Sequence, residues 1–438
     1  MKFLIVVFYV STALLLLNNC DSTDPKLEPE LVLKLEDVSC TEAWLQLKTT
    51  NLQLPNNVTL FINDLQERTF NLTSADTLLY IDSLLPNQNY SFQIMSFYNP
   101  EDGIKSNKVN ASTMDTTNHN FTWQTFTFGE TGAGGSTLYD VVIINENDIW
   151  AVGEIYMNDS LGSPDPLPYN AVHWDGVEWE VKKITVNFRG FLITPTLEGA
   201  FAFSDTDIWF IGSLPIHGDG ENWIIYDIRN IGNPNLDLLR IWGDNPSNFY
   251  LVGRLGSIAH YNNQNWKNLT FSTNLNLYSI WGSYIVESNQ NEVIAVGSAV
   301  GTSSGSLILK IDKETVTEIS SQEINGNLVS VWFESGRAYY LISAATLYFK
   351  HNLTDTNWKK FNGITAFSKT SIYGEAINDV FLTASYGDIV HYNGVSWFSY
   401  YDQTKLNVGV YSAIKLKNNL AIAVGYLSNK AVVAVGRR

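Results

Sequence analysis

The motif NDIWAVG at residues 147–153 decides the fold of this chain, together with HWDGVEW at residues 173–179. Variants of the pair recur downstream, as NFYLVG at 248–253 with HYNNQNW at 260–266, and as NDVFLTA at 378–384 with HYNGVSW at 391–397. Each copy reads as four short strands, and an Asp-Gly, Asn-Asn or Asn-Gly pair between the last two suits a two-residue type I′ turn. One copy therefore predicts a four-stranded antiparallel sheet.

Such a sheet cannot bury both of its apolar faces alone, so the copies must stack on one another at a period of roughly 40 to 50 residues. A glycine or another small residue ends the second strand of each copy and serves to count the copies. These positions are Gly153, Gly212, Gly253, Gly297, Ser343, Ala384 and Gly425. The sequence thus predicts seven units.

The last unit lacks a fourth strand, because only one further strand, at residues 431–435, follows Gly425. Residues 121–128, FTWQTFTF, share the Trp-then-alternating form of the predicted fourth strands that begin at Trp179 and Trp266. Pairing of this segment with the last unit closes a ring and removes both exposed sheet edges. We therefore predict that residues 120–438 form a seven-bladed β-propeller whose N-terminal strand closes the last blade.

The composition fits an all-β protein and limits its partners. The 438 residues are 45% hydrophobic and 13% aromatic but only 16% charged, which is enough for a large core. The net charge is −17, and no basic stretch is present to neutralise a phosphate backbone. We expect no nucleic-acid partner.

Residues 1–19 have the form of a secretory signal, with Lys2 followed by an apolar run over residues 3–17. Cys20 follows directly, and residues 20–27 read as a polar tether. This arrangement resembles a bacterial lipoprotein signal, although Asn19 stands where a small residue is usual. The resemblance implies export, acylation of Cys20 and attachment to the cell envelope, most simply the outer membrane at its periplasmic or surface face. The alternative is an ordinary signal peptide, with Cys20 paired to Cys40 or removed.

Residues 28–116 form a unit unlike the repeats, with alternating strands predicted at 43–48, 58–62, 77–81 and 90–94. The segment LLPNQNYSFQI at 84–94 resembles the fibronectin type III family. The resemblance implies a β-sandwich in which the Tyr90 hydroxyl bonds to the upstream backbone and Trp44 is the core tryptophan of the second strand. Such a domain assigns no activity by itself.

Large aromatic residues recur at one position of the predicted innermost strands. In the first reading they wedge between neighbouring blades as packing. In the second they form an aromatic ring at one channel mouth that stacks on a sugar or a peptide. The candidate ligand-binding residues are Phe201, Trp242, Trp281, Trp332 and Tyr373.

Two polar residue types also recur at matched positions. Asp148, Asp207 and Asp379 precede the second strands, where Asp is expected to bond the backbone of its own turn. His173, His260 and His391 share a position in the third strands. Equivalent places on a ring lie too far apart to share a metal ion, which needs ligands at about 2 Å. We expect no metal, no cofactor and no catalytic residue among them.

These patterns favour a non-catalytic, membrane-anchored, extracytoplasmic binding or scaffold protein whose propeller loops recognise a protein or a glycan. The longest loops are expected at 158–168, 284–290 and 298–306. The alternative is a carbohydrate-active enzyme, a glycosidase, lyase or glycosyl transferase, that uses carboxylates at the propeller mouth. The carboxylates to test first are Asp140, Glu198, Asp244 and Glu375.

Overall fold

The computed structural model describes residues 28–438 except 100–101, 264, 286–287 and 300–304. The regular secondary structure of the described residues is almost entirely β-strand, with one four-residue helix, α1 (Tyr401–Thr404), and one 3-10 turn, η1 (Arg254–Gly256). The prediction of an all-β protein is confirmed. Cys20 and the signal segment lie outside the described residues, and no helix within the described part is long and apolar enough to span a bilayer.

The chain divides into two units, which are described separately. The N-terminal unit comprises residues 28–38 and 42–113 of the described chain, and the C-terminal unit comprises residues 39–41 and 114–438. The first sheet of the N-terminal unit has the order β1 (Glu30–Val38), β2 (Ala43–Thr50), β5 (Asp76–Ile81). The second has the order β4 (Leu65–Leu72), β3 (Asn56–Ile62), β6 (Asn89–Asn99), β7 (Asp102–Lys105), and β8 (Val109–Ser112) also pairs with β6.

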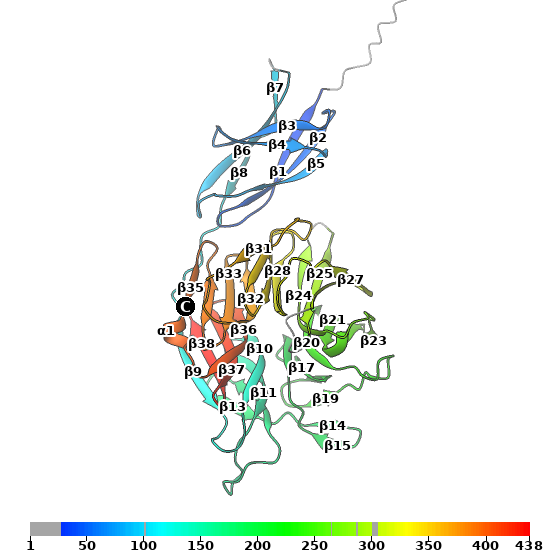
Figure 1. The fold of residues 1–438 in the computed structure, drawn as a ribbon, viewed down its shortest axis with the longest axis vertical. Coiled ribbons are helices and arrows are strands. Elements are labelled where there is room, and N and C mark those ends of the chain that lie inside the picture. The colour runs from blue at the N-terminus through cyan, green and yellow to red at the C-terminus, as the bar shows by residue number, and fades with distance from the viewer. Residues whose placement is uncertain (1–27, 100–101, 264, 286–287, 300–304) are drawn as a thin grey trace, which may run out of the picture. The chain divides into compact units, whose positions relative to one another are not determined.

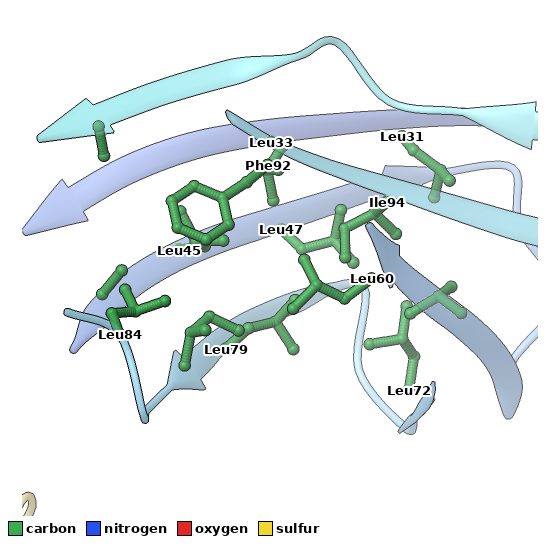
Figure 2. Packing of buried hydrophobic residues seen from close by; sticks show 14 of the residues in the cluster. Leu31, Leu33, Leu45, Leu47, Leu60, Leu72, Leu79, Leu84, Phe92 and Ile94 are labelled. Atoms are coloured by element: carbon green, nitrogen blue, oxygen red, sulfur yellow. The ribbon is translucent and has the colours of Figure 1, made fainter. Parts of the chain in front are cut away.

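Alternating apolar residues of both sheets meet in one core. Leu45 and Leu47 of β2 enter it from the first sheet, and Leu60, Phe92 and Ile94 enter it from the second (Figure 2). Each of these side chains is essentially inaccessible to water. Because successive side chains of a strand point to opposite faces, this alternation follows directly from the sequence.

Two expectations for this unit have different outcomes. The Tyr90 hydroxyl accepts a hydrogen bond of 2.8 Å from the upstream Leu85 amide, which confirms the predicted tyrosine corner bond. The placement of Trp44 is wrong. Trp44 is buried but does not belong to the core between the sheets, because Leu45 and Leu47 set the inward-facing register of β2. Its ring lies 5.8 Å from that of Tyr80 instead.

The C-terminal unit contains seven four-stranded sheets within its described residues, numbered here in chain order. Sheet 1 is β10 (Thr137–Asn145), β11 (Asp148–Ile155), β12 (Tyr169–Trp174), β13 (Trp179–Lys182); sheet 2 is β16 (Gly199–Ser204), β17 (Asp207–Gly212), β18 (Leu214–Gly218), β19 (Trp223–Ile225); sheet 3 is β20 (Leu238–Asn245), β21 (Asn248–Gly253), β22 (Ile258–Asn262), β23 (Asn265–Asn268). Sheet 4 is β24 (Asn276–Ile285), β25 (Gln290–Ser298), β26 (Ser306–Asp312), β27 (Thr315–Ile319); sheet 5 is β28 (Leu328–Glu334), β29 (Ala338–Ser343), β30 (Leu347–Lys350), β31 (Lys359–Phe361). Sheet 6 is β32 (Lys369–Ala376), β33 (Asp379–Ala384), β34 (Ile389–Tyr392), β35 (Trp397–Ser399); sheet 7 is β36 (Gly409–Lys417), β37 (Leu420–Leu427), β38 (Lys430–Arg437), β9 (Thr122–Phe128).

The seven sheets follow one another around a common centre. The first strand of each sheet contacts the first strand of the next, and β36 of sheet 7 contacts β10 of sheet 1. In Figure 1 the colours run in chain order around this unit, with β19, β23 and β27 on its outside. The ring of contacts is therefore continuous.

Strand β9 precedes the other strands of the C-terminal unit in the sequence, and it forms the fourth strand of sheet 7. It pairs antiparallel with β38, with Phe126 opposite Val433 and Trp123 opposite Gly436. The predicted pairing of residues 121–128 with the last unit is confirmed. Phe126 packs on the core between sheets 7 and 1. Trp123 packs on the core between sheets 6 and 7, with its ring against Gly436, so β9 fills space on both of its faces.

The hairpins between third and fourth strands follow the predicted two-residue turn in sheet 3, where Asn262 pairs with Asn265 and Asn263 has positive φ, but not in sheets 1 and 2. Trp174 pairs with Trp179, which leaves a four-residue loop. The Asp175 carboxylate accepts hydrogen bonds from the Val177 and Glu178 amides within it. Asp219 makes the same turn in sheet 2, and its backbone hydrogen bonds lower the pKa of that carboxyl to about 2. The prediction of type I′ turns is wrong here because the Asp side chain closes the loop in place of a second residue with positive φ.

Candidate functional site

The five candidate aromatic residues lie on the first strands of sheets 2 to 6, and two of them fill space between sheets. A methyl group placed on Gly282 of sheet 4 would lie 2.4 Å from the Trp242 ring of sheet 3. A methyl group on Gly374 of sheet 6 would lie 2.6 Å from the Trp332 ring of sheet 5. Both indoles are nearly inaccessible to water. These contacts give Trp242 and Trp332 a packing role. Phe201 is half-buried, with its ring 5.0 Å from that of Phe203.

Trp281 and Tyr373 come together, with ring centroids 5.2 Å apart in an edge-on arrangement. The Trp281 indole N–H donates a hydrogen bond of 2.9 Å to the Phe333 carbonyl of sheet 5. One side chain thus links sheets 4, 5 and 6. Both rings line a cavity at the centre of the unit.

This central cavity has a volume of about 70 Å³ and is lined by first strands of the sheets. A water molecule occupies about 30 Å³ in the liquid, so the cavity holds two or three waters and is too small for a sugar ring. Serine and threonine hydroxyls make up much of the wall, and three charged side chains enter it: Asp140, Arg240 and Lys415.

The charged residues of the cavity have different partners. Asp140 is buried, and its carboxylate accepts hydrogen bonds from the Val141 amide at 2.9 Å and from the Ala200 amide of sheet 2 at 3.2 Å. Arg240 donates to the carbonyls of Glu198 and Leu239. The Lys415 ammonium lies 4.6 Å from the centre of the Tyr373 ring. Burial lowers the pKa of Lys415, Arg240 lowers it further, and Asp140 opposes both.

The other three carboxylates that the sequence offered for catalysis are also engaged. Glu198 binds the Arg254 guanidinium through both oxygens, at 2.8 and 2.9 Å. Asp244 accepts hydrogen bonds from the Asn248 and Asn291 side chains. The Glu375 carboxylate accepts a hydrogen bond of 2.7 Å from the Asn418 amide. The three carboxylates thus share none of these hydrogen-bond partners.

The repeated histidines and aspartates form a structural pair in each sheet that has them. His173 bonds Asp148 at 2.9 Å and stacks on Trp150 at 3.9 Å between ring centroids. The expectation that these aspartates bond their own turn is wrong, because the neighbouring third strand brings an imidazole to them. The equivalent pairs are His217 with Asp207, His260 with Asn248, and His391 with Asp379.

His217 was missed in the sequence, although HGDGENW at residues 217–223 repeats the spacing of HWDGVEW. Among the described residues, no group of three or more histidine, cysteine, aspartate or glutamate side chains is placed to hold a metal ion.

In sheet 6 a second histidine, His119, contacts the His391–Asp379 pair. The fully buried His391 lies with its Nδ1 atom 2.8 Å from Nδ1 of His119, which precedes β9. Because a carboxylate only accepts, Nε2 of His391 donates to Asp379, so its Nδ1 accepts from His119. Arg438 binds the same Asp379, and its guanidinium lies 4.9 Å over the Phe121 ring. The residues just before β9 and just after β38 are therefore joined through one carboxylate.

A groove of about 700 Å³ lies beside sheets 1 and 2. One wall is the hairpin of β14 (Val186–Phe188) and β15 (Phe191–Ile193), and the other includes β19. Leu192 and Ile224 line the groove and are 75% and 62% exposed, and the neighbouring Phe191 is 74% exposed. Apolar side chains of this size rarely gather on a surface without a partner.

Ion pairs hold the β14–β15 hairpin in place. Arg189 at its turn and Arg229 both bind the Asp227 carboxylate, at 2.6 and 2.9 Å. Both Arg189 and Gly190 have positive φ, the type I′ geometry, but an Arg-Gly turn carries a weak sequence signal. The sequence therefore did not predict this groove. Of the loops expected to recognise a partner, residues 158–168 do not line it, and the other two include residues outside the described part.

Comparison with known proteins defines the class of fold. No protein-family model and no curated protein matches the chain. The solved structure of YCF48 bound to D1 peptide superposes with a TM-score of 0.53 at 14% sequence identity, covering 74% of this chain and 99% of that one. The structure of the Dos1 propeller covers 72% of this chain and 95% of its own, at 10% identity and a TM-score of 0.48. The chain contains a β-propeller.

The histidine pair of sheet 6 predicts a loss of stability in acid. Burial, followed by the neighbouring His391, lowers the pKa of His119 from 6.5 to about 4, and burial also lowers that of His391. Because both folded-state pKa values are depressed, the stabilisation is present above pH 6.5 and is lost as the pH falls toward 4. We expect His119→Asn to remove roughly 1 kcal/mol of the pH-dependent stability, discounted for partial exposure.

The measurement is the urea midpoint at pH 7.0, 5.5 and 4.5 for the wild type, His119→Asn and the control His351→Asn. The control should keep the slope of the wild type. A His119→Asn protein whose midpoint falls as steeply as that of the wild type would contradict this account of the pair.

Proposed function

We propose that the chain is a non-catalytic, membrane-anchored binding protein whose propeller recognises an extended peptide segment of a partner protein. The observation that carries this proposal is the 700 Å³ groove with Leu192 and Ile224 exposed in its lining. Its volume falls within the range of about 300 to 1,000 Å³ typical of ligand sites. Its lining combines exposed apolar side chains with polar ones such as Lys182, Asn187 and Asn222, and an extended peptide can use both, through its apolar side chains and its backbone amides.

The architecture proposed for the two units supports this role. The seven sheets of the C-terminal unit act as seven blades, and β9 closes the ring by pairing with β38. The N-terminal unit acts as a fibronectin type III domain, supported by its two sheets and the Tyr90 hydroxyl bond. A domain of this kind serves as a spacer that presents the propeller.

A peptide partner is also supported by comparison. YCF48, whose fold this chain shares, was solved with a peptide bound. The groove lies at the edge of β19, the last strand of sheet 2, where extended chains commonly add to exposed sheet edges. The carbohydrate-active alternative gains no support from the four candidate carboxylates, since each already binds other groups of the protein.

Substitutions in the groove should abolish peptide binding without unfolding the protein. We expect Leu192→Asp and Ile224→Asp to weaken binding at least tenfold, because a carboxylate would have to be desolvated against the apolar ligand. Leu161→Asp is the matched control, since Leu161 is 87% exposed and does not line the groove. Residues 20–438 with Cys20→Ser would be applied to arrays of twelve-residue peptides and of glycans. Peptide binding that survives both groove substitutions, or binding to glycans alone, would overturn the proposal.

The proposed anchor rests on the apolar run at residues 3–17 and on Cys20 directly after the signal segment. An acylated Cys20 would hold the protein at the cell envelope, most simply at the outer membrane. On Triton X-114 partitioning of the host cells, we expect the wild type in the detergent phase and Cys20→Ser in the aqueous phase. Equal partitioning of the two proteins would reject the anchor.

A further inference from the structure

The central cavity contains an imbalance of charge. Two cations, Arg240 and Lys415, and one carboxylate, Asp140, enter it from three different first strands. The imbalance stands out in a chain whose formal net charge is −17. Because the cavity is narrow and walled by protein, solvent screens these charges less than it does at the surface.

Lys415 is the group that lacks an anion. Within the described part of the chain, no carboxylate lies within ion-pair distance of its ammonium, and its nearby partner is the Tyr373 ring. Asp140 is the one carboxylate among the cavity's described lining residues, and its oxygens bond to the Val141 and Ala200 amides, so its single charge leaves one of the two cations unbalanced. Arg240 directs one terminal nitrogen to two carbonyls, which leaves its remaining N–H groups for a ligand.

A half-buried, poorly hydrated ammonium without an anionic partner is costly. Desolvation at this position accordingly lowers the pKa of Lys415. An anion between Lys415 and Arg240 would remove the repulsion between the two cations and bring the net charge of the cavity to zero. The hydroxyl groups of Ser371 and Ser412, which also line the cavity, would supply further donors to it.

The size of the cavity limits the anion. A volume of about 70 Å³ admits one small ion with one water, and excludes a nucleotide, a sugar acid or a peptide chain. A single negative charge suffices for neutrality. Halides meet both conditions.

We propose that the centre of the propeller binds one halide ion between Lys415 and Arg240. The ion would link β20, the first strand of sheet 3, to β36, the first strand of sheet 7. This link would stabilise the ring. This site is separate from the groove, and the proposal does not depend on the identity of any peptide partner.

The test is thermal unfolding in sodium bromide, in sodium formate and in sodium gluconate at equal ionic strength, gluconate being too large for the cavity. Three proteins are compared: the wild type, Lys415→Met, and the control Lys417→Met, which changes an exposed lysine two residues along the same strand. In 200 mM bromide we expect Tm of the wild type and of Lys417→Met to rise by about 2 °C or more over gluconate. Lys415→Met should show no bromide effect and should be at least as stable as the wild type in gluconate.

A crystal grown in bromide provides the second measurement, with an anomalous peak expected within hydrogen-bond distance of Lys415 Nζ. The proposal is overturned if the cavity shows no such peak, or if Lys415→Met responds to bromide as the wild type does. Stabilisation by formate without stabilisation by bromide would also overturn it, because the site would then take a carboxylate.

Discussion

The pairing of β9 with β38 is the interaction on which the C-terminal unit depends. It joins residues 122–128 to residues 431–437, more than 300 positions away, through one antiparallel ladder. Without it, β38 would expose an unpaired edge and the core between sheets 7 and 1 would lose Phe126. Since each sheet is held only by its neighbours, an opening at one junction would loosen the whole ring.

Closure is reinforced by a network that, among the described residues, occurs in sheet 6 alone. Asp379 binds His391 of its own sheet and Arg438 at the end of the chain, and His391 in turn binds His119. The Tyr400 hydroxyl donates to the His119 carbonyl at 2.9 Å, which fixes the approach to β9. In sheets 1 to 3 the repeated histidine pair is a packing element. In sheet 6 the pair is extended by His119 and Arg438 into a network that joins the residues before β9 to the residue after β38.

The repeats made much of this structure predictable. The motif pairs, the small residue that ends each second strand, and the Trp-containing segment at 121–128 led to the sheets and to the β9 pairing. The position of Trp242 and Trp332 on first strands followed from the same alignment. Features that occur once were not predictable. Asp140, Arg240 and Lys415 lie on separate strands, and only the register of the sheets brings them into one cavity. The β14–β15 hairpin departs from the repeat. Trp44 was misplaced because Leu45 and Leu47 of β2 face the core, so that Trp44 points to the other face of the strand, and the sequence alone leaves this register open.

Hydrogen exchange at β38 measures the closing interaction most directly. In the full chain, residues 122–128 would be replaced by a Gly/Ser segment of equal length, and the same replacement of residues 187–193 would serve as the control. The account predicts that the first change abolishes protection of the amides of residues 431–436 and lowers the unfolding free energy by several kcal/mol, since it removes three large aromatic side chains. The control should leave that protection intact. Unchanged exchange at residues 431–436 after loss of β9 would contradict the claim that this strand closes the ring.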